Sequence, residues 1–243
     1  MRLLSFNKMG KHAIGILKQN TNTIVDLSLA DPSLPTDMNN FIDLGSEAIE
    51  LVERIVKNSN ENIEKKLSEI QLLSPIPVPR RNIFCVGRNY YEHAKEFHDS
   101  GFDATAGKSA VPDDPIIFTK ATTSMSGPFD PIPSYHDTSN STDYEGELAV
   151  IIGTDGRDIK KNDAFDFVYG YSVSNDVTAR NLQHKHKQWF LGKSLDGYYP
   201  MGPVIVTSDE AGHPDNFHLK TLVNGEERQN SSVADLIFDI PTL

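Results

Sequence analysis

The sequence predicts an α+β fold in which β-strands predominate. Short segments rich in Val, Ile and aromatic residues recur along the 243 residues, and each is bounded by Gly, Pro, Asn or Asp. Residues 46–58 instead have the spacing of an amphipathic helix. Asn224-Gly225, which lies between two strand-like segments, is a dipeptide typical of β-hairpin turns. We therefore expect many short strands and few helices.

The first 74 residues are predicted to form a small domain of strands and one helix. Its expected elements are strands at residues 12–17 and 23–28 and a helix at residues 46–58. Ser46 is a suitable N-cap for this helix. Residues 74–80 contain three prolines, which favour a stiff, extended connector. We place a boundary near residue 75, so that the domains comprise residues 1–74 and 75–243.

The second domain is predicted to hold most of the strands. Its expected elements are strands at residues 82–87, 115–120, 142–153, 166–176 and 202–208, helices at residues 88–97 and 178–189, and a hairpin at residues 219–229. The closing segment, from Ser231, begins like a capped amphipathic helix and ends on an apolar run. Few folded domains finish in this way, so we expect the chain to be shorter than the fold it belongs to.

Composition narrows the class of protein. Lys and Arg total 23 against 34 Asp and Glu, a net charge of −11, which argues against a nucleic-acid-binding surface. The chain has no apolar run near the ~20 residues that cross a bilayer, and its start does not resemble a secretory signal. Cys85 is the single cysteine, and it lies between Phe84 and Val86, which predicts a buried thiol and not a nucleophile. These features indicate a cytoplasmic protein.

Three acidic residues form a candidate metal site. In "TDYEGELAVIIG", Glu145 and Glu147 are two residues apart and point to the same side of an extended strand, although most such pairs are a solvated edge. Gly146 between them permits close approach of a ligand or another backbone. Asp176 follows a strand and supplies a third carboxylate, unless it caps the next helix. Three carboxylates form an all-oxygen site suited to Mg²⁺ or Mn²⁺.

A histidine and a glutamate form a second candidate site. His93 and Glu96 are three residues apart in a predicted helix and therefore share one face. One interpretation is an ordinary surface pair. The other is a general base, in which a carboxylate orients a histidine that takes a proton from water.

Cationic and amide side chains surround these candidates in the sequence. Lys120 and Lys193 each end an apolar segment beside a turn, which suits a substrate-facing role. Arg180 and Gln183 are three residues apart on the helix predicted after Asp176, so they share a face and could bind carboxylate or carbonyl oxygens.

The chain from about Pro75 to its last residue resembles the fumarylacetoacetate hydrolase family. Six blocks carry the resemblance, in this order: "VGRNYYEHAKEF", "FTKATTS", "DYEGELAVIIG", "YSVSNDVTARNLQ", "FLGKSLDGYYPMGPVIV" and "VNGEERQ". The resemblance implies a mixed β-roll or sandwich, preceded by the small N-terminal strand–helix domain of bacterial members. It also implies a homodimer and an Mg²⁺ or Mn²⁺ ion whose ligands are Glu145, Glu147 and Asp176.

The resemblance implies roles for the remaining candidates. The catalytic His–Glu dyad of the family falls on His93 and Glu96, and its substrate-contacting glutamine and lysine fall on Gln183 and Lys193. Lys120 matches a lysine near the metal in related members. Family members continue for several tens of residues with strands and a Thr-Gly-Thr-Pro motif, which does not occur here, so the second domain is expected to be incomplete at its C-terminus.

Together these features predict an enzyme that acts on a small 2-oxo or diketo acid, with no nucleic-acid or membrane partner. The leading hypothesis is hydrolysis of a C–C bond in an acylpyruvate-like 1,3-diketo acid. In it the metal chelates the 2-oxo acid end, His93 activates water, and Lys193 stabilises developing charge. Decarboxylation of oxaloacetate and isomerisation of 2-hydroxyhepta-2,4-diene-1,7-dioate would use the same enolate. A metal-binding protein without catalysis is a further alternative.

Overall fold

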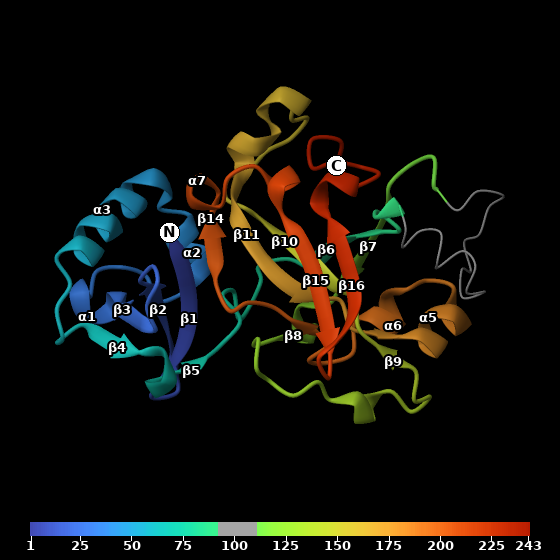
Figure 1. Cartoon of the computed structure of the whole chain (residues 1–243), viewed down its shortest axis with the longest axis horizontal. Coiled ribbons are helices and arrows are strands. Elements are labelled where there is room, and N and C mark those ends of the chain that lie inside the picture. Colours follow the sequence, from blue (N-terminus) through green and yellow to red (C-terminus); the bar gives the residue numbers. More distant parts are fainter. Residues whose placement is uncertain (92–110) are drawn as a thin grey trace.

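The computed structural model describes residues 1–91 and 111–243, and strands predominate in it, which confirms the predicted α+β class (Figure 1). The strands are β1 Arg2–Lys8, β2 Lys11–Leu17, β3 Thr23–Asp26, β4 Glu64–Lys66, β5 Gln71–Leu72, β6 Ile83–Gly87, β7 Ile116–Lys120, β8 Met125–Ser126, β9 Thr142–Asp143, β10 Gly146–Ile152, β11 Val168–Asn175, β12 Thr178–Ala179, β13 Tyr199–Pro200, β14 Ile205–Thr207, β15 His218–Val223 and β16 Glu226–Ser232. The α-helices are α1 Leu27–Ala30, α2 Met38–Ile42, α3 Gly45–Lys57, α5 Arg180–His186, α6 Phe190–Lys193 and α7 Ser208–Ala211.

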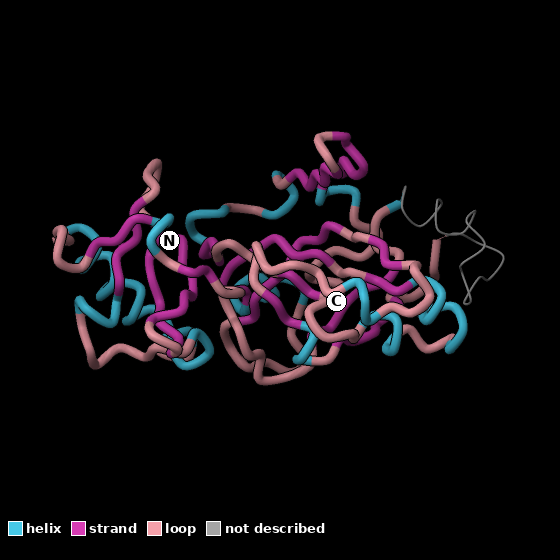
Figure 2. Tube along the Cα trace, turned by 90° about the horizontal axis from the view of Figure 1, so that it is seen from below, coloured by secondary structure: helices cyan, strands magenta, loops and turns pink. Residues whose placement is uncertain are grey.

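One large sheet runs through the molecule. Its strands follow the order β10-β11-β14-β1-β2-β3-β4, and β5 also pairs with β1. The antiparallel contact of β1 with β14, Arg2 with Val206 and Leu3 with Ile205, joins the N-terminal strands to the rest. Figures 1 and 2 show these N-terminal elements at one end of an elongated molecule. The boundary near residue 75 stays a prediction, since one hydrophobic core includes side chains from both sides of it.

The first strand, β1, is not among the predicted elements. Its residues Leu3, Leu4 and Phe6 are at most 1% exposed, and the strand lies in the middle of the large sheet. Such a strand, buried on both faces, loses the alternation of apolar and polar residues that marks a half-exposed strand. The predicted strands at residues 12–17 and 23–28 are confirmed as β2 and β3.

Helix boundaries depart from the sequence predictions at two places, and a third predicted helix is untested. The helix predicted at residues 46–58 is confirmed as α3, but Ser46 is not its N-cap, because the chain enters directly from α2 and Leu44 is already helical. The single helix predicted at residues 178–189 is instead β12 followed by α5, which ends before Lys187, whose φ is +59°; α6 begins only at Phe190. The helix predicted at residues 88–97 lies mostly outside the described residues.

The closing segment forms a strand and one short turn of helix. Ser231 and Ser232 belong to β16 and pair with Leu219 and His218, so the amphipathic helix predicted there is wrong. Only a 3-10 turn, Val233–Asp235, follows. Non-local pairing with β15 outweighs the local helical pattern. The predicted hairpin itself is confirmed, with positive φ at both turn residues, as a type I′ turn requires.

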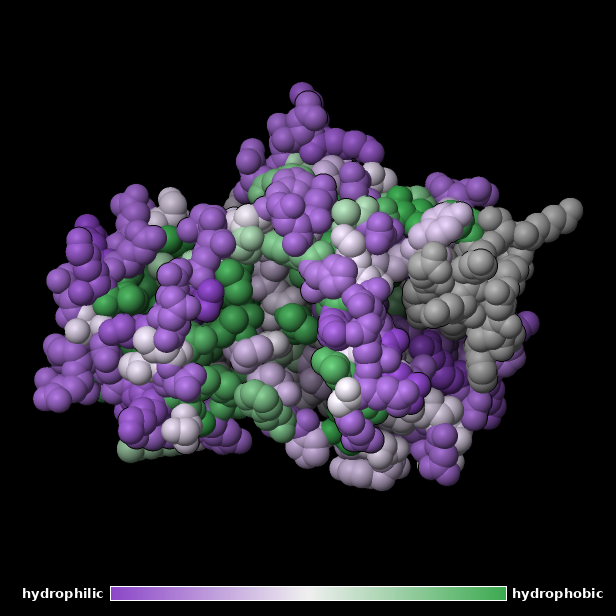
Figure 3. Space-filling model, viewed as in Figure 1, coloured by the Kyte–Doolittle hydropathy of each residue, from purple (hydrophilic) through white to green (hydrophobic). Residues whose placement is uncertain are grey.

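The surface is uneven in polarity. On the face drawn in Figure 3, hydrophilic residues cover the outer parts, and hydrophobic residues gather between the N-terminal strands and the β15–β16 hairpin. No helix in the described part of the chain is long and apolar enough to cross a membrane.

A buried aspartate organises the turn that leads into β9. Asp137 is 2% exposed, and its carboxylate accepts hydrogen bonds from the backbone N–H of Ser139 (2.9 Å) and of Ser141 (2.6 Å). The hydroxyls of both serines also donate to it. Burial alone would raise the pKa of Asp137, but these hydrogen bonds outweigh it and lower the pKa to about 2.

We expect Asp137→Asn to lower the free energy of unfolding by about 1–3 kcal/mol, because an amide N–H would face the donors of Ser141. A lowered pKa stabilises the fold above the unfolded pKa of about 4 and loses that contribution as pH falls towards 2. Urea unfolding at several pH values measures both effects. The wild type should lose more stability between pH 4 and pH 2 than the variant, and exposed Asp166→Asn should behave like the wild type.

Candidate functional site

The antiparallel register of β10 and β11 brings two of the predicted acids together. Gly146 pairs with Asn175, so Glu145 immediately before β10 and Asp176 immediately after β11 lie at the same end of the sheet. The backbone N–H of Asp176 donates to the carbonyl of Glu145 (2.7 Å), and the N–H of Glu145 donates to Oδ1 of Asn175 (2.9 Å). The strand ends therefore hold both acidic residues at fixed positions.

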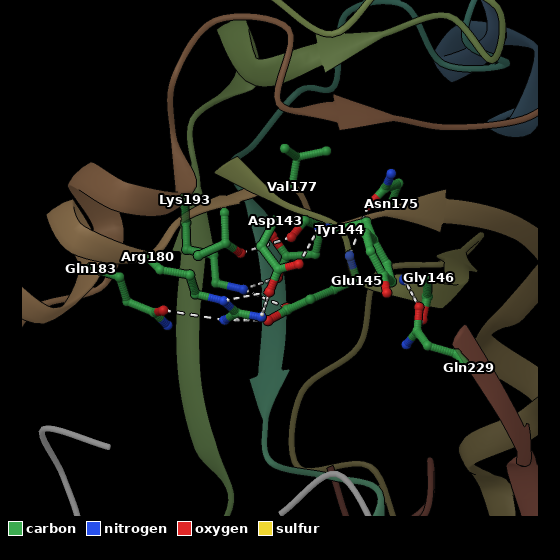
Figure 4. A network of polar contacts seen from close by, with 12 residues as sticks. Asp143, Tyr144, Glu145, Gly146, Asn175, Val177, Arg180, Gln183, Lys193 and Gln229 are labelled. Carbon is green, nitrogen blue, oxygen red and sulfur yellow. Dashed lines mark hydrogen bonds and ion pairs between the residues drawn. The ribbon is translucent and has the colours of Figure 1, made fainter. Parts of the chain in front are cut away.

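A lysine bridges the two carboxylates. Nζ of Lys193, at the end of α6, donates to Oε2 of Glu145 (2.6 Å) and to Oδ2 of Asp176 (2.9 Å); Figure 4 labels Lys193 and Glu145. The Lys193 side chain is 2% exposed. Burial by itself lowers the pKa of Lys193, but the two carboxylates outweigh it and raise the pKa above its ordinary value. Lys193 therefore carries its charge inside the protein.

A second buried lysine approaches Asp176 from β7. Nζ of Lys120 donates to Oδ1 of Asp176 (2.7 Å) and to the carbonyl of Val177 (2.9 Å), and the residue is fully buried. Burial lowers the pKa of Lys120, and Asp176 offsets this only in part because Lys193 acts in the opposite direction. The two oxygens of Asp176 thus each hold one lysine.

Arg180 connects the acids to the predicted substrate-binding glutamine. Its Nη1 contacts Oε1 of Glu145 (2.7 Å) and donates to Oε1 of Gln183 (3.3 Å), which agrees with the shared helix face predicted for Arg180 and Gln183. Its Nε and Nη2 contact Oδ2 of Asp143 at 2.9 and 2.8 Å. Asp143 is absent from the predicted site. The sequence feature that could have identified it is the alternate spacing of the acidic residues Asp143, Glu145 and Glu147.

Glu147 is the carboxylate that these cations do not reach. No hydrogen bond or ion pair from another described residue involves its side chain, and Glu147 is partly buried. Burial, and then repulsion from Glu145 and Asp176, raises the pKa of Glu147 well above its usual range, and Lys193 opposes the shift. A further cation would relieve this repulsion.

The donor set fits a hard divalent ion, whereas the present positions of the oxygens fit an ammonium group. Carboxylate oxygens are the ligands that Mg²⁺ and Mn²⁺ prefer. Within residues 1–91 and 111–243, however, no three His, Cys, Asp or Glu side chains are grouped closely enough to hold one metal ion. Lys193 holds the oxygens of Glu145 and Asp176 instead. A metal would therefore require the carboxylates to turn away from this lysine.

The charged cluster opens onto a large cavity of about 1650 Å³. The polar residues that line it here are Glu145, Glu147, Asp176, Arg180, Gln183 and Lys193. Cys85 also lines it, but burial raises the pKa of its thiol, as expected of an unreactive cysteine, although neighbouring Phe84 is 66% exposed. The predicted dyad of His93 and Glu96 lies outside the described residues, so its role stays a prediction.

Comparisons with known proteins agree on one family. The family described as "Fumarylacetoacetate (FAA) hydrolase C-terminal" matches residues 82–243. Oxaloacetate tautomerase YisK of Bacillus subtilis is 46% identical over 177 residues, which are 73% of this chain and 56% of that protein. The mitochondrial oxaloacetate tautomerase fahd2 of Xenopus laevis is 39% identical over 247 residues, covering 100% of this chain and 73% of the relative.

A solved structure shares the fold. Maleylpyruvate hydrolase of Sphingobium sp. SYK-6, in complex with manganese(II) and pyruvate, superposes with a TM-score of 0.76 at 26% identity, covering 100% of this chain and 80% of that one. In the comparison with the Bacillus subtilis protein, the aligned part of this chain covers little more than half of that protein's length. The family match extends over more than half of this chain and includes every described site residue. The chain therefore belongs to the fumarylacetoacetate hydrolase family, as its six sequence blocks predicted.

Proposed function

We propose that the chain forms a divalent-metal-dependent enzyme that interconverts the enol and keto forms of a small 2-oxo diacid of the oxaloacetate type. The observation that carries this proposal is the buried cluster around Lys193, in which cations and carboxylates alternate at the edge of a cavity while Glu147 lacks a cationic partner among the described residues. Two relatives named oxaloacetate tautomerase, at 46% and 39% identity, support the choice of substrate.

Glu145, Glu147 and Asp176 would hold the metal. Their oxygen donors suit Mg²⁺ or Mn²⁺, and burial, followed by repulsion from Glu145 and Asp176, raises the pKa of Glu147. The manganese in the maleylpyruvate hydrolase structure supports this assignment. When bound, such an ion supplies a Lewis acid that stabilises an enolate.

The residues of the chain would bind the acid and stabilise its charge. Enol and keto forms share one enolate and differ only in whether oxygen or carbon carries the proton. Lys193 keeps its charge in the buried cluster, and if Glu145 and Asp176 held a metal, its ammonium group would be placed to stabilise the enolate oxygen. Arg180 and Gln183 line the cavity and are suited to bind a substrate carboxylate. His93, with Glu96, remains the proposed general base.

Hydrolysis of a C–C bond in an acylpyruvate is the second candidate. The likeness to a maleylpyruvate hydrolase supports it; water activated by His93 would attack the distal carbonyl, and the C–C bond would break to release the enolate of pyruvate. Decarboxylation of oxaloacetate also releases the enolate of pyruvate, together with CO₂. The three reactions differ in their products, so they can be separated directly. The proposed homodimer and cytoplasmic location are tested by light scattering and by fractionation of cells that express the chain.

A substrate panel tests the reaction type. With Mn²⁺ present, we expect the ultraviolet absorbance of enol-oxaloacetate to decay faster with the protein than without it, and EDTA to remove this acceleration. Release of CO₂ should not increase, and acetylpyruvate should remain intact. Faster formation of pyruvate from oxaloacetate would instead establish decarboxylation, and cleavage of acetylpyruvate would establish hydrolysis.

Glu147→Gln separates metal binding from stability. We expect the substitution to raise the free energy of unfolding of the metal-free protein by roughly 1 kcal/mol, because it removes the cost of burying an ionisable carboxyl and also its repulsion from Glu145 and Asp176. The same change should weaken Mn²⁺ binding by more than about 10- to 100-fold, the usual effect of losing an outer-shell partner. Urea unfolding and titration calorimetry measure the two effects.

The exposed Glu226→Gln is a matched control for this substitution and should change neither quantity. A metal affinity that Glu147→Gln leaves intact would show that Glu147 is not a ligand. A metal-free Glu147→Gln protein less stable than the wild type would show that the carboxylate has a stabilising partner.

A further inference from the structure

The β15–β16 hairpin reaches the acidic strand through one side chain, Gln229. Its Oε1 accepts a hydrogen bond from the backbone N–H of Gly146 (2.7 Å), and its Nε2 donates to the carbonyl of the same residue (3.5 Å), as Figure 4 shows for this pair. Gly146 is the residue between Glu145 and Glu147. A side chain 83 positions away in the sequence therefore holds the peptide that carries both acids.

This contact occupies an edge of the sheet. Among the described residues β10 is the last strand of the large sheet, so no described strand pairs with the peptide groups on its outer side. The groups of Glu145 face β11, where they bond to Asn175 and Asp176, and those of Gly146 face outwards. The amide of Gln229 takes the place that a peptide of a further strand would occupy.

The hairpin is shaped for this contact. The register of β15 and β16 shifts between the pairs Thr221–Gln229 and Leu222–Glu227, which leaves Arg228 as a bulge directly before Gln229. Bulges of this kind redirect side chains. The hydroxyl of Thr221 also donates to Oε1 of Gln229 (2.7 Å) and so fixes the amide.

The glycine at position 146 is explained by the same approach. A Cβ built on Gly146 would lie 2.2 Å from Oγ1 of Thr221 and 3.1 Å from Oε1 of Gln229. The first distance is far shorter than any van der Waals contact. The groups that come close to Gly146 are thus the side chains of Thr221 and Gln229 in the hairpin, where the sequence predicted a ligand or another backbone.

We propose that Gln229 is a positioning residue, which fixes the Gly146 peptide and thereby the directions in which Glu145 and Glu147 present their carboxylates to a divalent cation. The inference rests on the proposed function, because it assumes that both glutamates bind the metal. Side chains that orient ligands in this way contribute strongly to metal affinity without touching the ion.

Substitution of Gln229 by Ala tests the proposal through two readouts. Titration calorimetry should show Mn²⁺ binding weakened by about 10- to 100-fold. Hydrogen exchange of the metal-free protein, followed by mass spectrometry, should be faster for peptides that contain Gly146 and unchanged in β2 and β3. Asn230→Ala on the same hairpin is the control, because Asn230 is exposed and its side chain hydrogen-bonds to Glu227 and His218 and not to β10 among the described residues, and it should alter neither readout.

A second pair of variants tests the same contact if Gln229→Ala fails to fold. Gly146→Ala should weaken Mn²⁺ binding, because its methyl group displaces Thr221 and with it the hairpin. Adding Thr221→Ala should recover much of the lost affinity, since the Thr221 Cβ lies 3.6 Å from the new methyl group, an ordinary contact distance.

The outcomes are distinguishable. The proposal is overturned if the wild type binds Mn²⁺ and Gln229→Ala binds it equally well, or if Asn230→Ala weakens binding as much. Failure of Thr221→Ala to improve Gly146→Ala would also contradict it. A wild type that binds neither Mn²⁺ nor Mg²⁺ overturns the proposed function itself, and the inference with it.

Discussion

The ion pair of Lys193 with Glu145 and Asp176 is the interaction on which the site depends. All three side chains are buried, and the lysine lies 48 and 17 positions from its partners in the sequence. Removing one member of such a group leaves an uncompensated charge inside the protein, which typically costs about 3–5 kcal/mol. Strands β10 and β11 and helix α6 must therefore bring Lys193 within hydrogen-bonding distance of both carboxylates. This requirement fixes the position of α6 relative to the end of the sheet.

The charge of the cluster is not balanced, and this imbalance links the fold to chemistry. Glu145 and Asp176 receive Lys193, Lys120 and Arg180, while Glu147 receives no cation from the described residues. A protein selected only for stability has little reason to bury an acid beside two others. The arrangement is explained if a further cation belongs to the working enzyme, and the lysine then has to share its carboxylates with that ion. If the ion and Lys193 compete for the same carboxylates, metal binding would make the charge of Lys193 available to a substrate.

Much of the fold follows from local pattern, and the errors in the strands come from pairing between strands. Helix α3, strands β2 and β3 and the Asn224-Gly225 turn follow from periodicity and turn chemistry, which depend on neighbouring residues. Strand β1 pairs with β14 far along the chain, and the strand that replaces the closing helix pairs with β15. Pairing energy from such partners exceeds the small local preferences that a pattern reveals.

The sequence by itself determined the chemistry of the site. Residue type sets the charge of each side chain, and two residues that are two positions apart in a strand point to the same side of it. Seven site residues were predictable on that basis or from the family blocks, and each lines the cavity or contacts a residue that does. They are Glu145, Glu147, Asp176, Lys120, Lys193, Arg180 and Gln183. Only the tertiary structure decided that Glu145 and Asp176 each contact two cations, that Glu147 contacts none among the described residues, and that Asp143 and Gln229 support the cluster. The physical reason is that ion pairs and hydrogen bonds depend on distances of about 3 Å between atoms, and the sequence does not contain those distances.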